Sequence, residues 1–312
     1  MSKFKPSMAV LAILAFALPA APAHAQLART FVSAAIGNDA NNCDRPTPCR
    51  TFQHAHDQTL ANGEITVLDP GGYGAVTINK TLSIINDGVG EAGVLVSGGA
   101  TGIIVQAGSL DNVSLRGITI KGIGFGSGDG IRFTGGLSLT IENCVVRNLI
   151  DGIQLFGSGI FAVSDTLVTD NANAGIGIQP FGAINIRAAF NRVEIYNSSA
   201  SGLIINGGGA TGTITATVSD SVAAHASIAF AAQSAAGQAT VNFTLVRSVA
   251  AYSDTGMSSN GSPVSLRFGS STVTGNTHTW QAINSAFLRS YGDNYIVGNA
   301  DGNPAPTTIA LQ

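Results

Sequence analysis

Apolar residues return at nearly constant spacing along most of this chain. An apolar residue, in most cases preceded by glycine, recurs every 22 to 29 residues. Spacing this regular is typical of a repeat protein whose units stack on one another. The residues at this position are Ile103, Ile131, Ile153, Ile176, Leu203, Ile228, Met257 and Trp280.

Each unit contains three short apolar runs separated by turn residues. In one unit Ile153 begins the first run, residues 160–165 form the second and residues 167–169 the third. Apolar and polar residues alternate with a period of two, which predicts β-strands with Ile153 facing inward and Val168 facing outward. Three strands in ~25 residues favour a solenoid over a propeller, whose blades run to ~40 residues. The pattern predicts an all-β protein: a single parallel β-helix of about eight or nine coils, with ~4.8 Å between coils.

A second column, made of polar residues, supports the same register. One polar residue in each unit stands two positions before an apolar one, as Asp165 stands before Leu167. Stacked side chains at one turn of every coil would satisfy the hydrogen bonds of the turn backbone. The column is predicted to consist of Asn143, Asp165, Asn191, Asp220, Arg247, Ser271 and Asn294.

The end of a solenoid needs a cap, because an open end exposes the core. Residues 48–60 predict a short N-terminal capping helix with Thr47 as N-cap and Pro48 at the first helical position. Phe52, Ala55 and Leu60 would face the first coil. We therefore expect an N-terminal loop and capping helix over residues 26–63, the β-helix over 64–299 and a C-terminal tail over 300–312.

The first 25 residues have the features of a secretory signal peptide. Lys3 and Lys5 supply positive charge, an apolar run extends from Met8 to Leu18, and a small-residue cleavage site ends at Ala25. The run is much shorter than the ~20 residues of a spanning helix, and no later stretch is long and apolar enough to span. We expect a secreted protein, extracellular or periplasmic, without a membrane span.

Composition agrees with a folded exported domain. Of the 312 residues 45% are hydrophobic and only 11% are charged, a balance that can bury a core. The net charge of −3 supplies no basic field for nucleic acid, which we therefore exclude as a partner. Nothing in the sequence indicates an oligomeric state.

Three cysteines are present, and two of them lie close together. Cys43 and Cys49 occupy a polar, proline-containing loop, and export predicts a disulfide between them. Cys144 stands inside an apolar strand, where we expect a small buried side chain rather than a nucleophile.

Four N-terminal segments resemble the opening of pectin-lyase-like β-helix proteins. Those proteins have a helix of pattern P-x-x-T-I-Q-x-A, followed by G-D-T-I-x-V, G-x-Y and K-x-L-x-I. The resemblance covers nearly the whole mature chain and implies a right-handed parallel β-helix of a type common in exported bacterial proteins. It does not specify an activity, because the superfamily includes lyases, hydrolases, esterases, epimerases and non-catalytic surface proteins. The matching segments are Pro48–Gln53, Ala61–Val67, Gly72–Tyr73 and Leu82–Ile85.

Enzymes of this superfamily often work on the outer face of the strand that begins each coil. One patch on this predicted face carries reactive groups: Asp129 and Asp151 fall at equivalent turns of adjacent coils, and Arg132 and Gln154 are equivalent neighbours. Two stacked carboxylates can act as acid and nucleophile, share a proton or bind a cation, while Arg132 would stabilise an anionic substrate group. Asp-Gly is also ordinary turn chemistry. The outward positions are predicted to be Ile104, Arg132, Gln154, Gly177, Ile204, Ala229, Ser258 and Gln281.

Tyr196, His225 and Tyr252 are predicted to share one turn column, one coil apart. This column is either a binding stripe or a set of solvated turn residues. No metal-ligand spacing stands out in the sequence, and no cofactor is expected, except that a lyase would be expected to use Ca²⁺.

Two hypotheses for the function follow. The first is a non-catalytic extracellular module, adhesin-like or glycan-binding, with a polysaccharide or cell-surface glycan as partner; short turns and a bland outer face favour it. The second is a polysaccharide lyase or glycoside hydrolase acting on an acidic glycan, with Asp129, Asp151 and Arg132 as catalytic residues.

Overall fold

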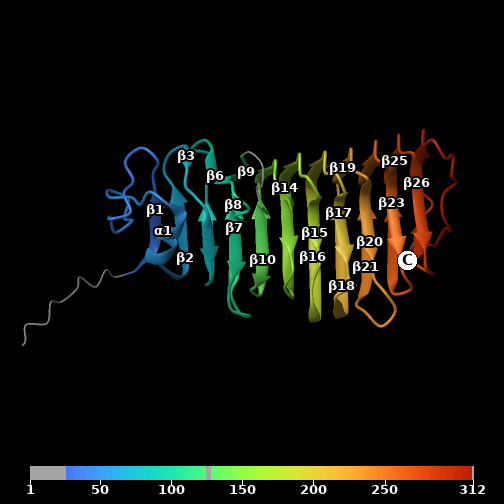
Figure 1. Cartoon of the computed structure of the whole chain (residues 1–312), viewed down its shortest axis with the longest axis horizontal. Helices are drawn as coiled ribbons and strands as arrows, with labels where there is room; N and C mark the ends of the chain where they lie inside the picture. The colour runs from blue at the N-terminus through green and yellow to red at the C-terminus, as the bar shows by residue number, and fades with distance from the viewer. Residues whose placement is uncertain (1–25, 124–127, 311–312) are drawn as a thin grey trace, which may run out of the picture.

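Residues 26–123 and 128–310 wind into a parallel β-solenoid of about eight turns, seen in a computed structural model (Figure 1). The predicted signal peptide, residues 1–25, lies outside the described residues. The coils lie side by side along one axis, from the N-terminal end on the left of Figure 1 to the C-terminal end on the right. The predicted all-β fold is confirmed, and its turn is right-handed.

Each coil contributes one strand to each of three faces, and every pairing between coils is parallel. Face one is a sheet of nine strands in the part of the chain that the structure describes. Its strands are β4 (Val76–Ile78), β7 (Ile103–Gln106), β10 (Ile131–Gly135), β13 (Ile153–Leu155), β15 (Ala174–Ile178), β17 (Ser201–Asn206), β20 (Ile228–Gln233), β23 (Thr255–Asn260) and β26 (His278–Ile283).

The remaining strands form one continuous sheet that bends at a corner into faces two and three. Face two contains β1 (Leu27–Val32), β2 (Thr59–Val67), β5 (Leu82–Ile85), β8 (Asn112–Arg116), β11 (Ser138–Glu142), the first parts of β14 (Gly159–Thr169) and β16 (Gly182–Tyr196), β18 (Ala210–Ser219), β21 (Thr240–Val246), β24 (Val264–Gly269) and β27 (Phe287–Ser290). Face three contains β3 (Gly71–Gly72), β6 (Ala92–Val96), β9 (Ile118–Gly122), β12 (Val145–Arg147), the last parts of β14 and β16, β19 (Val222–Ala224), β22 (Val249–Ala251), β25 (Thr272–Thr274) and β28 (Tyr295–Val297).

The core is a set of stacked apolar columns inside the three faces. Ile153 is fully buried, as predicted, and pairs in register with Ile131 and Ile176. The prediction for Val168 was wrong, because Val168 is 0% exposed while Leu167 points outward. Asp165, at the corner inside β14, has a φ of 49°, which shifts the alternation by one position between the two parts of this strand.

The coil around residue 230 also departs from the predicted register. Phe230, not Ile228, pairs with Leu203 and Met257 in the core column. The outward position of this coil is consequently Ala231, and the prediction of Ala229 was wrong. The error arose because Ala229 takes the place of the glycine that marks the strand start in most coils, so the marker was absent.

The predicted polar column lies at the corner between faces two and three. Some of its predicted members stand one residue before or after the residue that forms the turn. Six residues there adopt φ between 48° and 52°, a left-handed conformation that bends the chain from face two into face three at a single residue. The next residue points inward and binds the neighbouring coil: Ser221 Oγ accepts from Val193 N–H at 3.0 Å. Ser271 and Asn294 belong to this inner ladder, and Asn191 precedes the turn residue Arg192. The residues with positive φ are Asn143, Asp165, Arg192, Asp220, Arg247 and Ser270.

A short helix covers the N-terminal end of face one, although it begins later than predicted. The helix α1 spans Phe52–Gln58, and its N-cap is Thr51, whose Oγ accepts from His54 N–H at 3.2 Å. Thr47, predicted to be the N-cap, is bound in a turn to Asp44 instead. Phe52 and Ala55 are buried as predicted, but Leu60 is 43% exposed because it already belongs to β2.

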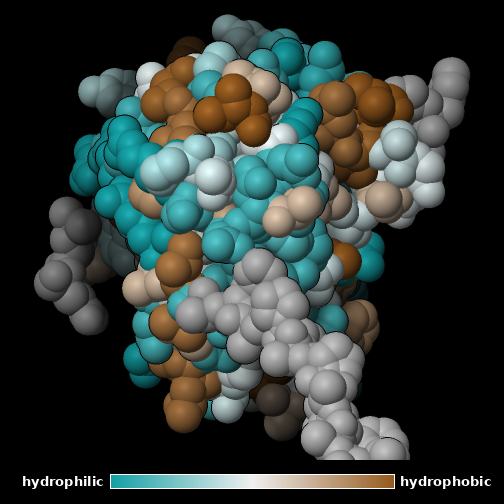
Figure 2. All heavy atoms as spheres, turned by 90° about the vertical axis from the view of Figure 1, so that its left-hand side faces the viewer, coloured by the Kyte–Doolittle hydropathy of each residue, from teal (hydrophilic) through white to brown (hydrophobic). Residues whose placement is uncertain are grey.

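At both ends of the rod, a capping segment forms hydrogen bonds with the strands that it covers. At the N-terminal end, Gln53 of α1 accepts a hydrogen bond from Thr77 N–H of β4 at 2.9 Å. Figure 2 shows this end of the molecule, where hydrophobic atoms form separate groups among hydrophilic ones. At the C-terminal end, Asp301 binds the hydroxyl and N–H of Thr279, and Trp280 Nε1 donates to Pro304 O at 2.9 Å. Capped ends protect the core and leave the three faces for interactions.

Candidate functional site

Four of the residues singled out from the sequence come together at the start of face one. Arg132 of β10 and Gln154 of β13 are in register on adjacent strands. Asp129 and Asp151 precede these strands at equivalent places, and Gly130 N–H donates to Asp151 O at 3.0 Å. The four side chains therefore belong to two neighbouring coils, one directly above the other.

Asp129 is tied to Arg132. Arg132 Nε and Nη2 lie 2.8 Å and 2.7 Å from Asp129 Oδ2, and the Asp129 side chain is only 7% exposed. Burial raises the pKa of the Asp129 carboxyl, with a further contribution from the negative charge of Asp151, while the bond to Arg132 acts in the opposite direction. A carboxyl with a raised pKa is the kind of group that serves as a general acid, but this one is covered by its own ion pair.

Asp151 is occupied by the next coil. Its Oδ1 accepts from Asn173 Nδ2 at 2.8 Å and from Ala174 N–H at 2.9 Å. Both bonds fix the turn that precedes β15. The carboxylate therefore has a structural task, and it shares no hydrogen bond with Asp129 among those of the described residues.

Gln154 occupies an outward position of face one, but its side chain is buried among its neighbours. Its side chain extends over Gly177 of the adjacent strand, where a Cβ would come within 2.5 Å of Gln154 Oε1. Gln179 Nε2 donates to this oxygen at 3.3 Å, and Gln154 itself is 1% exposed. Within the part of the chain that the structure describes, Gln154 Nε2 has no hydrogen-bond partner. The face thus contains an amide donor whose bonding is incomplete.

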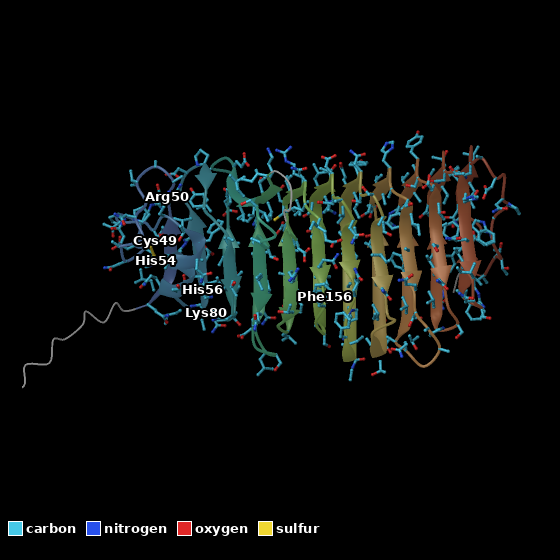
Figure 3. All side chains as sticks on the ribbon, viewed as in Figure 1. Cys49, Arg50, His54, His56, Lys80 and Phe156 are labelled. Atoms are coloured by element: carbon cyan, nitrogen blue, oxygen red, sulfur yellow. A yellow bond between two sulfur atoms is a disulfide. The ribbon has the colours of Figure 1, made fainter. Side chains whose placement is uncertain are left out.

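Two phenylalanines that the sequence analysis did not select flank this patch. The rings of Phe156 and Phe181 are stacked, with centroids 6.1 Å apart and an interplanar angle of 17°. The guanidinium carbon of Arg132 lies 5.9 Å from the Phe156 centroid, and Phe181 is 68% exposed. Figure 3 places Phe156 on the outside of the solenoid near the middle of the rod. The sequence contained a signal for this aromatic patch, because Phe156 is an apolar residue at an outward position directly after inward-facing Leu155.

A column of carboxamides continues from the phenylalanines along the rod. Asn206, Gln233 and Asn260 pair in register on the outer edge of β17, β20 and β23, and Gln179 precedes them on the coil of β15. Beside them is a recess of about 480 Å³. None of the residues that line it is charged: Asn206, Gly208, Gln233, Ser234, Ala235, Ala236, Asn260, Gly261, Ser262 and Asn284.

The predicted stripe of Tyr196, His225 and Tyr252 is only partly assembled. His225 and Tyr252 stack with ring centroids 5.5 Å apart, and Tyr252 is 61% exposed. Tyr196 pairs with Ala224 and precedes the column, in which Asn197 takes the corresponding place with φ of 52°. The turn residue with positive φ again displaces the register by one.

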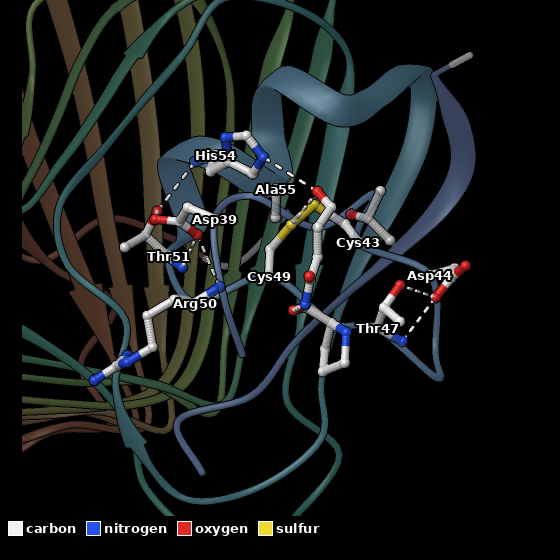
Figure 4. Close-up of a disulfide and its surroundings, with 12 residues drawn as sticks. Asp39, Cys43, Asp44, Thr47, Cys49, Arg50, Thr51, His54 and Ala55 are labelled. Carbon is white, nitrogen blue, oxygen red and sulfur yellow. Dashed lines mark hydrogen bonds between the residues drawn. A yellow bond between two sulfur atoms is a disulfide. The ribbon is translucent and has the colours of Figure 1, made fainter. Parts of the chain in front are cut away.

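The N-terminal loop contains the predicted disulfide. Cys43 and Cys49 are bonded, so the cluster that they form with His54 offers no thiolate to a metal ion (Figure 4). Asp39 accepts from the N–H groups of Arg50 and Thr51, which holds the chain extended up to the helix. Cys144 is free and buried, and burial raises the pKa of its thiol to about 11.

Comparisons by sequence find nothing: no protein-family profile and no curated protein matches the chain. Comparisons by structure find solved proteins of low identity. The pectate lyase Pel9A superposes with a TM-score of 0.66 at 16% identity, covering 87% of this chain and 76% of its own. A rhamnogalacturonan lyase gives 0.57 at 13%, covering 90% and 86%, and the GH136 lacto-N-biosidase from Eubacterium ramulus gives 0.51 at 10%, covering 86% and 68%.

The protein is therefore a right-handed parallel β-helix protein with the pectin-lyase-like fold. At these identities the likeness establishes the fold and not the activity. Among the described residues, no helix is long and apolar enough to cross a membrane.

Proposed function

We propose that the protein is a secreted, non-catalytic module that binds a glycan along the outer side of face one. The observation that carries this proposal is the stacked phenylalanine pair, of which Phe181 is exposed and Phe156 half-buried, continuous with a row of uncharged amides. An exposed apolar surface edged with polar groups is typical of an interaction site. A sugar offers an apolar ring face to an aromatic side chain and hydroxyl groups to amides, so the two parts of the strip complement it.

The two parts are joined by the turn that follows β17. A Cβ on Gly209 would lie 2.8 Å from Phe181 Cδ1, so this ring rests against the glycine. Gly208 in the same turn borders the amide recess. A glycan chain lying along the rod would therefore contact Phe156 and Phe181 first and the amide column next, and the unpaired Gln154 Nε2 lies beneath its path.

Binding is favoured over catalysis by the state of the two carboxyls. Asp129 is covered by Arg132, and Asp151 is engaged by the following turn. Neither presents an unoccupied oxygen pair to a substrate, and the recess beside the amide column has no acid or base. Secretion is supported by the disulfide, because disulfides persist in oxidising compartments.

The test is affinity electrophoresis of the mature protein in gels containing neutral polysaccharides, such as xylan, β-glucan and galactan. We expect retardation by at least one of them, and at least tenfold weaker binding for Phe181→Ala, a loss of about 1.4 kcal/mol. Tyr295→Ala is the matched control, since Tyr295 is an aromatic residue of face three that is 72% exposed. Equal binding by Phe181→Ala and Tyr295→Ala, at unchanged melting temperature, would mean that the glycan does not contact Phe181. The absence of retardation by every neutral glycan would overturn the proposal.

A second candidate function is a lyase or hydrolase acting on an acidic glycan, which the raised pKa of Asp129 favours. It requires the Asp129–Arg132 pair to open around the substrate. Incubation with uronate-rich polymers, with and without Ca²⁺, tests it. Chain cleavage that Asp129→Asn and Asp151→Asn each abolish would establish the enzyme and refute the non-catalytic function.

A further inference from the structure

Face two is positively charged over its C-terminal half. Its strand segments at residues 182–191, 210–219, 240–246, 264–269 and 287–290 contain three arginines and no carboxylate. The complete chain has a net charge of −3, so this surface differs in sign from the molecule as a whole. The three arginines are Arg187, Arg267 and Arg289.

Arg267 and Arg289 form the centre of this surface. They are in register on the adjacent parallel strands β24 and β27, about 4.8 Å apart along the rod. Within the described ranges neither forms an ion pair. Like charges directly opposite each other on a sheet repel, so the pair is unfavourable without an anion between or above it.

The exposed arginines of the neighbouring corner show the contrast. Arg192 is held by Asp165 at 2.6 Å and Arg247 by Asp220 at 2.7 Å, each through two nitrogens. These pairs are complete and their charges are balanced within the chain. Arg267 and Arg289 differ from these corner arginines, because neither has a carboxylate partner within the described ranges.

An apolar surface and a groove accompany the two arginines. Phe287 is 49% exposed, and the guanidinium carbon of Arg289 lies 4.5 Å from its ring centroid. A groove of about 310 Å³ passes over Arg267, Phe287 and Arg289 and over the polar side chains of Asn242 and Ser265. It thus offers charge, an aromatic surface and neutral hydrogen-bonding groups within one small area.

We propose that this groove is a second binding site, for a polysaccharide that carries sulfate or carboxylate groups. The guanidinium forks of Arg267 and Arg289 bind one oxyanion from two coils, and the sugar ring packs on the free part of Phe287. Arg187 extends the site along the rod, where it lines another groove of the same face. It is in register with Ser265, two residues before Arg267, and lies three coils away, ~14 Å along the rod. The site lies on a different face from the proposed neutral-glycan strip and does not depend on it.

Nucleic acid fits this surface less well. A phosphate backbone carries one charge per ~1.7 Å of duplex and is bound by many cations. Three arginines over five coils match a polymer whose charges are widely spaced. The second site therefore favours an acidic glycan.

κ-Carrageenan, with one sulfate on each disaccharide, and neutral agarose provide a matched pair of ligands with and without charge, and polygalacturonate provides carboxylate in place of sulfate. We expect the mature protein to bind at least one charged polymer and not agarose, with affinity falling as salt is added. Arg267→Gln and Arg289→Gln should each weaken this binding at least tenfold. Arg147→Gln, which removes an exposed arginine from face three, should leave it unchanged.

Three results would overturn the second site. One is an equal loss of binding in Arg147→Gln, which would indicate a general effect of net charge. Another is tighter binding of a single-stranded DNA oligonucleotide that Arg267→Gln weakens in parallel. The third is loss of binding in Phe181→Ala but not in Arg267→Gln, which would assign the acidic polymer to face one.

Discussion

A carboxylate at position 168 should destabilise the coil strongly and in a manner that depends on pH. Val168 is 0% exposed, with a methyl group facing Gly152 of the next face. In Val168→Asp the new carboxyl must be neutral to remain inside, and protonating a group of pKa ~3.9 at pH 7 costs about 4 kcal/mol. Losing the buried valine adds about 2 kcal/mol. The expected deficit of about 6 kcal/mol is comparable with the entire stability of many domains.

The free-energy deficit of Val168→Asp should also depend on pH. Protonation becomes easier by about 1.36 kcal/mol for each unit, so the deficit of Val168→Asp should shrink by about 2.7 kcal/mol between pH 7 and pH 5. Urea unfolding at the two pH values measures this change. Val168→Thr introduces a polar group without a charge, and its deficit should be the same at both pH values. Leu167→Asp, which places the charge on the outer surface, should be tolerated.

Two outcomes would refute this argument. Equal damage from Leu167→Asp and Val168→Asp would mean that the register of this strand is wrong by one residue. A deficit of Val168→Asp that does not change with pH, beside a folded Val168→Thr, would mean that the carboxyl reaches solvent.

Two further predictions concern the N-terminal cap. Burial acts to raise the pKa of Asp69, but hydrogen bonds from Ser33, Tyr73 and backbone N–H groups outweigh it and lower the pKa. A lowered pKa means that the ionised carboxyl stabilises the folded state. This stabilisation is present above the unfolded pKa of ~3.9 and is lost as pH falls through the folded pKa. Asp69→Asn should therefore flatten the fall in melting temperature below about pH 5, and an unchanged acid profile would contradict this. Replacing Cys43 and Cys49 with serine removes their bond and frees the loop, which should lower the free energy of unfolding by roughly 2 kcal/mol. The melting temperature of this variant should not depend on reductant. A melting temperature equal to that of the oxidised protein would show that the loop is held by its hydrogen bonds alone.

The fold could be predicted from the sequence because the repeat is local. Each coil contains its own period-two strands and turn residues, so Ile153 and its equivalents fall at regular intervals that one sequence displays. The disulfide was predictable for a similar reason, since Cys43 and Cys49 lie in one short loop. Parallel stacking then brings equivalent residues of adjacent coils together, as it does Arg132 and Gln154.

The exact register could not be predicted, because single residues with positive φ interrupt the alternation. Arg192 adopts this conformation although arginine is not a usual turn residue. Its place at the corner becomes visible only in the structure, where the next residue, Val193, is hydrogen-bonded to the neighbouring coil. The same one-residue displacement misplaced Tyr196 and gave the wrong direction for Val168. In degenerate coils, where Ala229 replaces the marker glycine, pairing with neighbours fixes the position and the local sequence does not.

Both candidate sites are formed by side chains from different coils. The tertiary structure decided which of these side chains come into contact. Phe156 and Phe181 belong to successive coils, and whether their rings stack is set by the distance between strands and by the glycines beside them. Arg267 and Arg289 look like ordinary surface residues in the sequence, and only their shared register shows two cations without a carboxylate. The sequence determines which residues face outward in a regular coil, whereas contacts between coils determine which of them meet, because the stacking distance is short and each contact is sensitive to a shift of one residue.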